Sequence, residues 1–303
     1  MKAVQFSEYG GPEVLHVVDV DEPHAGPGQV RIAVRAAGVN PSDWKRIAGQ
    51  YRDHEKVTFP SGVGVEASGV VDEVGLGVSK VSMGDAVFGC GENANTVAQY
   101  AVLTHWAKKP DDLSFEVAGG LPVIADTATR ALDEVGVKSG ETILVSGAAG
   151  GVGSAVLQFA RLRGITVIGT ASAQNHDYLR GFGAIPTTYG PGLAKRVREL
   201  APEGVDAALD LAGSGIIPEL IEIVGDPSRV LSVADFSAPQ YGAKFSYGPP
   251  KDMERVLADV ARLCSEGLFR LRLEQTFPIE QTVKAQEVSA KGHVAGKLVI
   301  TIS

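Results

Sequence analysis

The stretch TILVSGAAGGVG, at residues 142–153, constrains the fold more than any other part of the sequence. The continuous apolar run at 143–145 is typical of a strand that is buried on both faces. Four glycines follow within positions 147–153, and apolar residues then recur at helical spacing over 152–160. The pattern predicts a buried strand, a glycine-rich turn and an amphipathic helix.

The chain continues this alternation after about residue 110. The apolar runs TILVS, ITVIG, VDAALDL and RVLSV are separated by helical patterns, which indicates a parallel sheet with helices on both faces. Before residue 110 the runs are short, often alternate and are separated by Gly, Pro and Asp, as in β-barrels and sandwiches. A chain of 303 residues has room for two domains. We therefore expect an α/β protein with a β-rich domain at 1–115 and 250–303 and a Rossmann-type doubly wound domain at 116–249.

The charge of the chain argues against two classes of partner. With a formal net charge of −8, binding to nucleic acid or to an anionic membrane is not expected. A local basic group formed by Lys195, Arg196 and Arg198 is expected to be the solvated face of a helix. The partner is therefore expected to be a small molecule.

The compartment follows from cysteine usage and from the N-terminus. Two cysteines, Cys90 and Cys264, provide neither a disulfide framework nor a cysteine zinc site. The opening MKAVQF lacks the apolar core of a signal peptide. The charge-free stretch 142–160 is interrupted by glycines and serines, and a strand, turn and helix explain it better than a membrane span. We expect a cytoplasmic protein.

The glycine turn has the features of a diphosphate site. A helix N-terminus presents unpaired N–H groups and a partial positive charge, both of which suit the pyrophosphate of a dinucleotide. A side chain at Gly150 or Gly151 would block the ligand, and Gly153 allows the helix to pack closely on the strand. A plain tight turn is the alternative. The residues expected to contact the cofactor here are Gly147, Ala149, Gly150, Gly151, Val152 and Gly153.

The end of the next strand selects the cofactor. In folds that prefer NAD, an acidic residue near this point binds the ribose 2′-hydroxyl. Here the strand ends in Thr170-Ala171-Ser172, and the first carboxylate is Asp177, inside the following helix. A carboxylate would repel a 2′-phosphate, whereas a small hydroxyl can donate to it. NADPH is therefore favoured, with Ser172 as the first candidate contact and Tyr189, after the third strand, as the second.

Several motifs together resemble the medium-chain dehydrogenase/reductase superfamily. They are the opening MKAVQFSEYGGPEVL, the stretch AAGVNPSDWKRIAG, the stretch GVGVEASGVVDEVGLGVSKVSMGDAVFG and the ending HVAGKLVI. With the glycine turn they cover essentially the whole chain and resemble the zinc-independent branch of quinone oxidoreductases and enone (alkenal) reductases. The resemblance implies a GroES-like β-rich catalytic domain and a homodimer.

The resemblance also implies that no metal is bound. Zinc alcohol dehydrogenases of the superfamily place cysteine where this chain has Asn40, and histidine where it has Val65. Neither Asn nor Val is a zinc ligand, and the remaining Glu66 alone is not a site. Without a Lewis acid, alcohol oxidation loses its means of stabilising the alkoxide. Quinones and α,β-unsaturated carbonyls need less help, because the anion that forms from them is delocalised.

Three side chains are candidates for the chemistry. The resemblance implies that Asn40 faces the nicotinamide, and its amide can donate to the oxygen on which charge develops. We expect Lys45 to donate to that oxygen or to the cofactor ribose, with Asp43 orienting it. The alternatives are that Asp43 caps a helix and that Lys45 is a solvated charge.

Four further positions follow from the resemblance and from the strand order. Thr127 is expected near the nicotinamide end of the cofactor, and Lys297 near the cleft. Ala212 and Val233, which follow the fourth and fifth strands, are expected to line the cofactor cleft. Asp126, beside Thr127, either biases the substrate or, as we expect, is an ordinary exposed residue.

The leading hypothesis is an NADPH-dependent, metal-free reductase of quinones or enones. An enoyl-thioester reductase or a biosynthetic tailoring reductase shares the same fold and cofactor and remains an alternative. A third possibility belongs to another class, an NADPH-binding structural or regulatory protein with little turnover. The retention of Asn40 and Lys45 beside the glycine turn favours chemistry over that last possibility.

Overall fold

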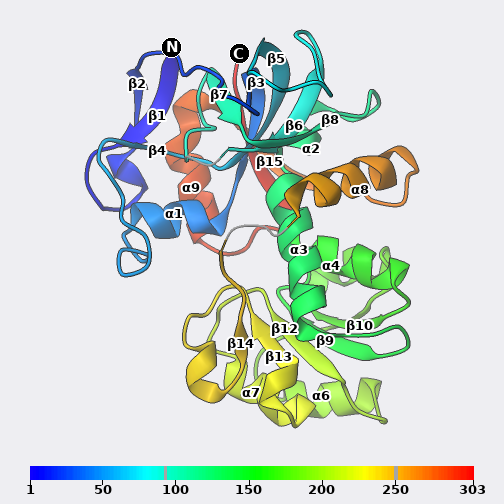
Figure 1. The fold of residues 1–303 in the computed structure, drawn as a ribbon. Helices are drawn as coiled ribbons and strands as arrows, with labels where there is room; N and C mark the ends of the chain where they lie inside the picture. The colour runs from blue at the N-terminus through cyan, green and yellow to red at the C-terminus, as the bar shows by residue number, and fades with distance from the viewer. Residues whose placement is uncertain (92–93, 249–251) are drawn as a thin grey trace. The chain divides into compact units, whose positions relative to one another are not determined.

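The computed structural model describes residues 1–91, 94–248 and 252–303. The chain forms two compact units, Met1–Val123 with Asp252–Ser303, and Ile124–Lys251. The first unit is rich in β-strands, and the second is built around a parallel sheet (Figure 1). The α/β fold expected from the sequence is confirmed. The domain boundary expected at 249–250 lies outside the described residues.

The first unit contains two sheets. The larger sheet follows the order β15 (Leu273–Pro278), β16 (Lys297–Thr301), β3 (Val30–Val39), β5 (Glu66–Val74), β6 (Ala86–Cys90) and β8 (His105–Lys108), with β7 (Tyr100–Leu103) paired to β3. The smaller sheet has the order β2 (His16–Asp19), β1 (Lys2–Phe6) and β4 (Ser61–Gly62). The main helices are α1 (Pro41–Ile47), α2 (Phe115–Gly119), α8 (Met253–Ser265) and α9 (Thr282–Ala290).

Strand β3 shows how the core of this unit is specified. Val30, Ile32 and Val34 are buried, whereas Arg35 is exposed, so the expected alternation of a half-buried strand is confirmed. The last four residues of β3 are all buried, because α2 packs against this half of the strand. A Cβ atom on Gly119 of α2 would lie 2.7 Å from the carbonyl oxygen of Ala36, so glycine permits this close approach.

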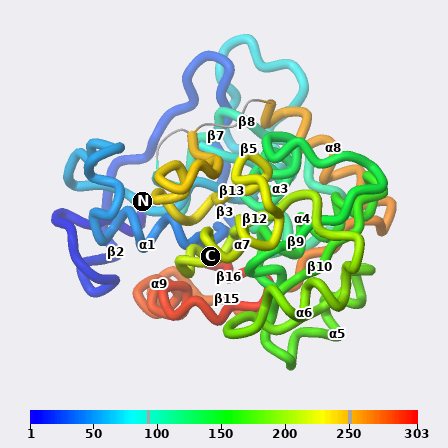
Figure 2. Tube along the Cα trace, turned by 90° about the horizontal axis from the view of Figure 1, so that it is seen from below, coloured from blue at the N-terminus to red at the C-terminus, as the bar shows by residue number. Residues whose placement is uncertain are grey.

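The second unit contains a six-stranded parallel sheet. Its order is β11 (Ile185–Thr187), β10 (Thr166–Thr170), β9 (Thr142–Ser146), β12 (Ala207–Asp210), β13 (Val230–Ser232) and β14 (Lys244–Phe245). Figure 2 shows β10, β9, β12 and β13 in this order. The chain proceeds outward from β9 to β11 on one side and from β12 to β14 on the other. The topological switch point therefore lies between β9 and β12.

The helices of the second unit cover this sheet. They are α3 (Pro122–Val135), which begins in the first unit, α4 (Gly151–Leu162), α5 (His176–Arg180), α6 (Leu193–Leu200) and α7 (Ile217–Val224). Helix α4 lies on one side of the sheet and α6 and α7 lie on the other (Figure 1). The strands expected at TILVS, ITVIG, VDAALDL and RVLSV correspond to β9, β10, β12 and β13. The short edge strand β14 was not expected.

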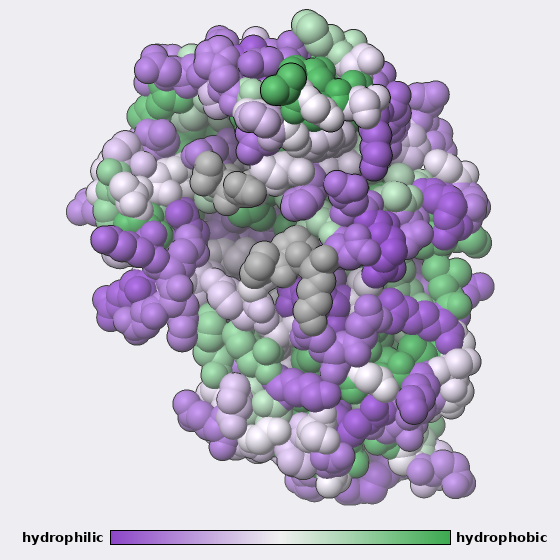
Figure 3. All heavy atoms as spheres, in the orientation of Figure 1, coloured by the Kyte–Doolittle hydropathy of each residue, from purple (hydrophilic) through white to green (hydrophobic). Residues whose placement is uncertain are grey.

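The charge-free stretch 142–160 forms strand β9, the glycine turn and the first part of α4, as the sequence predicts. Across the described part of the chain, every helix is too short or too polar to cross a lipid bilayer. Hydrophilic residues dominate the face drawn in Figure 3, interrupted by small apolar patches.

Candidate functional site

Two glycines of the turn between β9 and α4 are required by the fold itself. Gly147 has a φ of +77°, in the left-handed region that side chains disfavour. A Cβ atom on Gly153 would lie 2.3 Å from the carbonyl oxygen of Gly147 and 2.7 Å from the backbone of Ala148. The first turn of α4 thus sits directly on the end of β9, as expected for Gly153.

Gly150 is different, because the fold does not require a glycine there. Its φ of −70° suits any residue, and the nearest atom to an added Cβ is the Gly147 carbonyl oxygen at 3.5 Å. Gly150 is the N-cap of α4 and has no side chain to accept hydrogen bonds. Within the described residues, no acceptor is found for the backbone N–H groups of Gly151, Val152 and Gly153. The helix therefore presents three donors, at the end that attracts anions.

The turn lies at the switch point of the sheet. Strands β9 and β12 are parallel neighbours, with Ser146 opposite Asp210 at their carboxyl ends. In open parallel sheets, ligands bind in the crevice outside this point. The buried carboxylate of Asp210 accepts hydrogen bonds from the N–H groups of Ala212, at 3.1 Å, and Gly213, at 3.0 Å. Asp210 therefore fixes the loop in which Ala212 was expected to contact the cofactor.

Ser232 ties this loop to the next one. Its hydroxyl donates to Oδ2 of Asp210 at 2.8 Å and accepts from the N–H groups of Ala234, at 3.0 Å, and Asp235, at 2.9 Å. Val233, the other expected cofactor contact, lies directly between these residues and donates its N–H to the Asp210 carbonyl at 3.1 Å. The sequence analysis missed Asp210 and Ser232. The available signal was a carboxylate at the end of the apolar run VDAALDL.

The positions expected to select the cofactor lie beyond β10 and β11. Ser172 is half-buried, and its hydroxyl oxygen accepts from Nδ2 of Asn175 at 3.1 Å, which leaves the hydroxyl proton available. Tyr189 is 58% exposed. The side chain of Asp177, the first carboxylate after the strand, is exposed on α5.

Arg196 corrects the expectation that its basic group is merely solvated. Its guanidinium is half-buried and donates to the carbonyl oxygens of Thr188, at 2.8 Å, Gly190, at 3.0 Å, and Pro191, at 2.8 Å. These bonds hold the loop that carries Tyr189. They also place a positive charge at that loop.

Asp126 is a second correction. It was expected to be exposed, but only 8% of its surface is accessible. Its Oδ2 lies 3.5 Å from Nε of Arg130, which also donates to the hydroxyl of Ser246. Burial raises the pKa of the Asp126 carboxyl, and the Arg130 charge opposes that rise. The neighbouring Thr127 is half-buried on α3, and nothing further distinguishes it as a cofactor contact.

In the first unit, three buried side chains converge where neighbouring strands end. Strand β16 pairs with β3, with Leu298 opposite Val39, so Lys297 and Asn40 are the next residues along each strand. Strand β5 pairs with the other edge of β3 and begins at Glu66. We call Asn40, Glu66 and Lys297 the Lys297 cluster, and they are 4%, 0% and 3% exposed.

The hydrogen bonds of the Lys297 cluster are short and complementary. Nζ of Lys297 donates to Oδ1 of Asn40 at 2.6 Å and to Oε1 of Glu66 at 2.7 Å. Nδ2 of Asn40 donates to the same Glu66 oxygen at 2.8 Å, and Oε2 accepts from the N–H of Val123 at 2.7 Å. A Cβ atom on Gly38 would lie 2.3 Å from Oε1 of Glu66, so glycine makes room for the carboxylate. Each oxygen of Glu66 therefore has a donor.

Asp43 and Lys45 lie on α1, immediately after Asn40. Asn40 is the N-cap of α1, and Asp43, at the third helical position, accepts its N–H at 2.8 Å. Asp43 thus contributes to capping, which was the alternative reading of this residue. Burial raises the pKa of the Asp43 carboxyl to about 6, against the Asn40 N–H and the Lys297 charge, which lower it. Lys45 is half-buried, and its ammonium lies 5.7 Å from the centre of the Trp44 ring.

The donor set at Asn40 does not fit a zinc ion. Oδ1 of Asn40 and Oε1 of Glu66 are already bound by the Lys297 ammonium. Zinc prefers thiolate, imidazole and carboxylate ligands, and Asn40 and Val65 supply none of these. In the part of the chain that the structure describes, no three His, Cys, Asp or Glu residues are grouped so that they could hold a metal ion.

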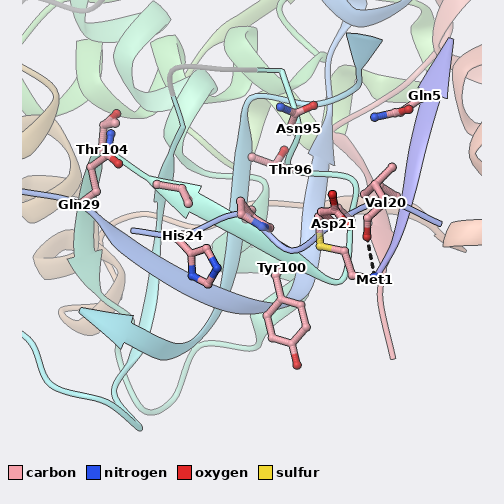
Figure 4. A pocket seen from close by; sticks show the side chains of 15 residues that line it. Met1, Gln5, Val20, Asp21, His24, Gln29, Asn95, Thr96, Tyr100 and Thr104 are labelled. Carbon is pink, nitrogen blue, oxygen red and sulfur yellow. Dashed lines mark hydrogen bonds between the residues drawn. The ribbon is translucent and has the colours of Figure 1, made fainter. Parts of the chain in front are cut away.

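A pocket of about 330 Å³ opens elsewhere on the first unit (Figure 4). It lies beside β1 and β7, and its lining includes His24, Asn95 and Tyr100 but none of the predicted site residues. Thr96, labelled in Figure 4, also lines it and donates its hydroxyl to the main-chain oxygen of Glu66 at 3.0 Å. The pocket is therefore separate from the candidate site, although one residue connects the two.

Comparisons with known proteins agree with this architecture. Residues 26–121 match the alcohol dehydrogenase GroES-like domain family, and residues 188–300 match the family described as zinc-binding dehydrogenase. The chain is 35% identical to part of the pikromycin polyketide synthase component PikAII of Streptomyces venezuelae, a match that covers 91% of this chain but only 8% of the synthase.

Two further relatives match over most of their own length. The 2-methylene-furan-3-one reductase of Solanum lycopersicum is 34% identical over 99% of this chain and 79% of its own. The structure of the quinone oxidoreductase from Coxiella burnetii is 31% identical, with a TM-score of 0.85 over 100% of this chain and 99% of its own. The chain belongs to the medium-chain dehydrogenase/reductase superfamily, in its quinone oxidoreductase branch.

Proposed function

We propose that this protein is an NADPH-dependent reductase that transfers a hydride to a quinone or an α,β-unsaturated carbonyl without a catalytic metal. The observation that carries the proposal is the set of three N–H groups, at Gly151, Val152 and Gly153, to which the described residues offer no acceptor. They lie at the switch point of the sheet, beside Gly150, whose glycine the fold does not require. A diphosphate that approaches the backbone accounts for both features.

The preference for NADPH rests on the residues after β10 and β11. Ser172 has a hydroxyl proton available to a phosphate oxygen, because its own oxygen accepts from Asn175. Arg196 adds a positive charge at the loop that carries Tyr189. The carboxylate that would favour a ribose hydroxyl is absent from this strand end. These contacts suit a 2′-phosphate better than a free 2′-hydroxyl.

When bound, the cofactor supplies a hydride, and a proton completes the reduction to the hydroquinone or the saturated carbonyl. The chain must hold the acceptor and stabilise the negative charge that grows on its oxygen. Asn40 is proposed for this task, because Glu66 is the one acceptor that the described residues offer to its Nδ2 group. The group has a second N–H, which is free to donate. Lys45 is proposed as a further donor to the acceptor oxygen or the ribose.

The absence of a metal from the reaction is proposed on the chemistry of the donors. The Lys297 ammonium binds Oδ1 of Asn40 and Oε1 of Glu66, which makes these atoms poor candidates for a cation site. Acceptors that give a delocalised anion do not need a Lewis acid to stabilise an alkoxide. The cytoplasmic location and the homodimer expected from the sequence remain predictions.

A second candidate acceptor is an enoyl thioester. The match of 35% to part of a polyketide synthase favours it, since this chain corresponds to one segment of that much longer protein. An NADPH-binding protein with little turnover shares the glycine turn and is the third candidate. The three candidate functions differ in which hydride acceptor, if any, the protein reduces.

The test has two steps. Fluorescence titration compares NADPH with NADH, and we expect the tighter dissociation constant for NADPH. NADPH consumption is then measured with a benzoquinone, a simple enone and a crotonyl thioester at equal concentrations. Turnover that is highest with the thioester would favour the second candidate, and tight binding without turnover across the panel would favour the third. If neither nucleotide binds at sub-millimolar concentration, the proposal is wrong.

A further inference from the structure

The amide of Asn40 has two ends of nearly equal shape and opposite chemistry. Its oxygen only accepts hydrogen bonds, and its NH₂ group only donates them. In the Lys297 cluster this amide lies between an ammonium, which only donates, and a carboxylate, which only accepts. Only one orientation of the amide satisfies both neighbours. Oδ1 must face Lys297, and Nδ2 must face Glu66.

We propose that Lys297 is a positioning residue that, together with Glu66, fixes the orientation of the Asn40 amide so that one N–H group is held ready for the acceptor oxygen. The inference rests on the proposed function, in which Asn40 donates to that oxygen. Lys297 itself touches neither substrate nor cofactor in this role. It acts by holding Oδ1 of Asn40 at 2.6 Å.

The backbone makes this arrangement rigid. The register of β16 on β3 sets Lys297 beside Asn40, and the start of β5 sets Glu66 beside both. Among the residues that the structure describes, Lys297 is the only buried lysine. Burial of a lysine costs free energy, because the long side chain loses rotamers and its charge must be compensated. A buried lysine is therefore expected where its charge has a specific role.

Removal of the ammonium would free the amide. Oδ1 of Asn40 would lose its donor, and the amide could turn so that both of its N–H groups face the Glu66 carboxylate. No N–H group would then be held for the acceptor. Loss of a group that orients a metal ligand typically costs about 10–100-fold in activity, and we expect a loss of that order here. We expect this loss in kcat, with little change in the dissociation constant for NADPH, because the glycine turn belongs to the second unit.

The test variant is the double substitution Lys297→Met with Glu66→Gln. It removes both charges, so that neither is left buried and unpaired, and it keeps the approximate volume of both side chains. The matched control is Lys108→Met with Asp85→Asn, which removes a pair between the exposed Lys108 and the half-buried Asp85, joined at 3.0 Å. Both proteins are compared with the parent for folding, NADPH affinity, kcat and KM.

Two acceptors separate positioning from a general loss of structure. A quinone bearing electron-withdrawing groups stabilises its own anion, whereas a simple enone depends more on a donor to its oxygen. We expect kcat of the double variant to fall more for the enone than for the quinone, while the control retains both. A folded double variant with unchanged kcat for both acceptors, or with equal losses for both, would overturn the proposal.

A measurement without turnover tests the orientation directly. The two side-chain N–H protons of Asn40, identified by their loss in Asn40→Asp, give NMR signals in the nitrogen-15-labelled protein. We expect the proton that donates to Glu66 to be protected from solvent exchange in the parent and to exchange faster in the double variant, and equal protection in both would contradict the inference. A parent protein that consumes no NADPH with any acceptor would instead overturn the proposed function, whatever the amide signals show.

Discussion

The glycine turn of the second unit and the Lys297 cluster of the first unit use their polar groups in opposite ways. At the turn, three backbone donors have no acceptor in the described part of the chain. In the cluster, every side-chain oxygen of Asn40 and Glu66 has a donor within 2.8 Å. N–H groups without an acceptor at a helix N-terminus are expected of a surface that binds an anionic ligand. A buried network in which every side-chain oxygen is satisfied is expected to hold a side chain in place.

The largest effect should follow from breaking the cluster on one side only. Lys297→Met alone leaves the Glu66 carboxylate buried at 0% exposure without the one cationic partner that the described residues give it. Removal of one partner of a buried ion pair costs about 3–5 kcal/mol. We expect this loss in the free energy of unfolding, measured by urea denaturation.

The double variant with Glu66→Gln should recover part of that loss. If the single and the double variants are equally destabilised, charge compensation is not what stabilises the cluster. The cluster would then not differ from the glycine turn in the way described above.

The pH dependence of stability tests a second buried charge beside the cluster. Burial raises the pKa of Asp43 from 3.8 to about 6. Below about pH 3 the carboxyl is mostly protonated in both the folded and the unfolded chain, and it has little effect. As the pH rises toward 6, only the unfolded chain ionises, so stability falls. Above pH 6 the loss is complete, at about 3 kcal/mol.

Asp43→Asn should remove this pH dependence, because asparagine does not ionise. Its amide oxygen can still accept the N–H of Asn40, so the hydrogen bond is kept. The variant should therefore be close to the parent in stability at pH 4 and more stable than the parent at pH 8. Denaturation curves at both pH values provide the measurement. A stability difference that does not change with pH would mean that the Asp43 carboxyl ionises freely in the folded protein.

Two alanine substitutions divide the glycine turn into its structural and ligand-facing parts. Gly153→Ala forces a Cβ atom to within 2.3 Å of the Gly147 carbonyl, and we expect it to cost about 2 kcal/mol of stability. Gly150→Ala places its Cβ atom at an ordinary 3.5 Å, so stability should change by less than about 0.5 kcal/mol.

The same Gly150→Ala substitution should weaken NADPH binding about tenfold, or about 1.4 kcal/mol, since the methyl group enters the space proposed for the diphosphate. Thermal unfolding and fluorescence titration on both variants separate the two effects. Unchanged affinity in Gly150→Ala would remove the ligand-based reason for glycine at that position.

The turn could be predicted from sequence because its information is local. Gly147 and Gly153 act within one strand, turn and helix, where a backbone angle or a close approach dictates the residue. The four inner strands of the sheet, β10, β9, β12 and β13, could also be predicted, from their apolar runs. The Lys297 cluster could not be found in this way, because Lys297 and Asn40 are 257 residues apart in the sequence. Their contact depends on the register of two strands, and no local pattern specifies that register.

Asp126 was misjudged for a related reason. A carboxylate on a helix is usually exposed. The partner Arg130 is local, four residues along the same helix, so the burial of Asp126 follows from tertiary packing that the sequence does not show. Asp210 was overlooked because it ends an apolar strand. Its side chain accepts hydrogen bonds from the loop that follows, and the pattern of the strand gives no sign of this. In each case the sequence identifies the residue type, but only the fold identifies the surroundings of its side chain.

The last prediction concerns the hydrogen bonds of Ser232, beside the glycine turn. Ser232→Ala removes the hydroxyl that donates to Asp210 and accepts the N–H groups of Ala234 and Asp235. We expect a loss of about 1–2 kcal/mol in stability, because these partners are left without one bond each. Ser232→Thr keeps the hydroxyl and serves as the conservative control.

The informative quantity is the NADPH affinity of Ser232→Ala relative to its stability. If the network only holds the fold, affinity should be retained at temperatures where the variant is fully folded. If the loops at Ala212 and Val233 contact the cofactor as proposed, their loosening should raise the dissociation constant severalfold at those same temperatures. The second outcome would show that the Ser232 network positions the loops at Ala212 and Val233 for the cofactor. The second unit would then combine a hydrogen-bonded network that orients loops with a helix N-terminus whose N–H groups bind the ligand.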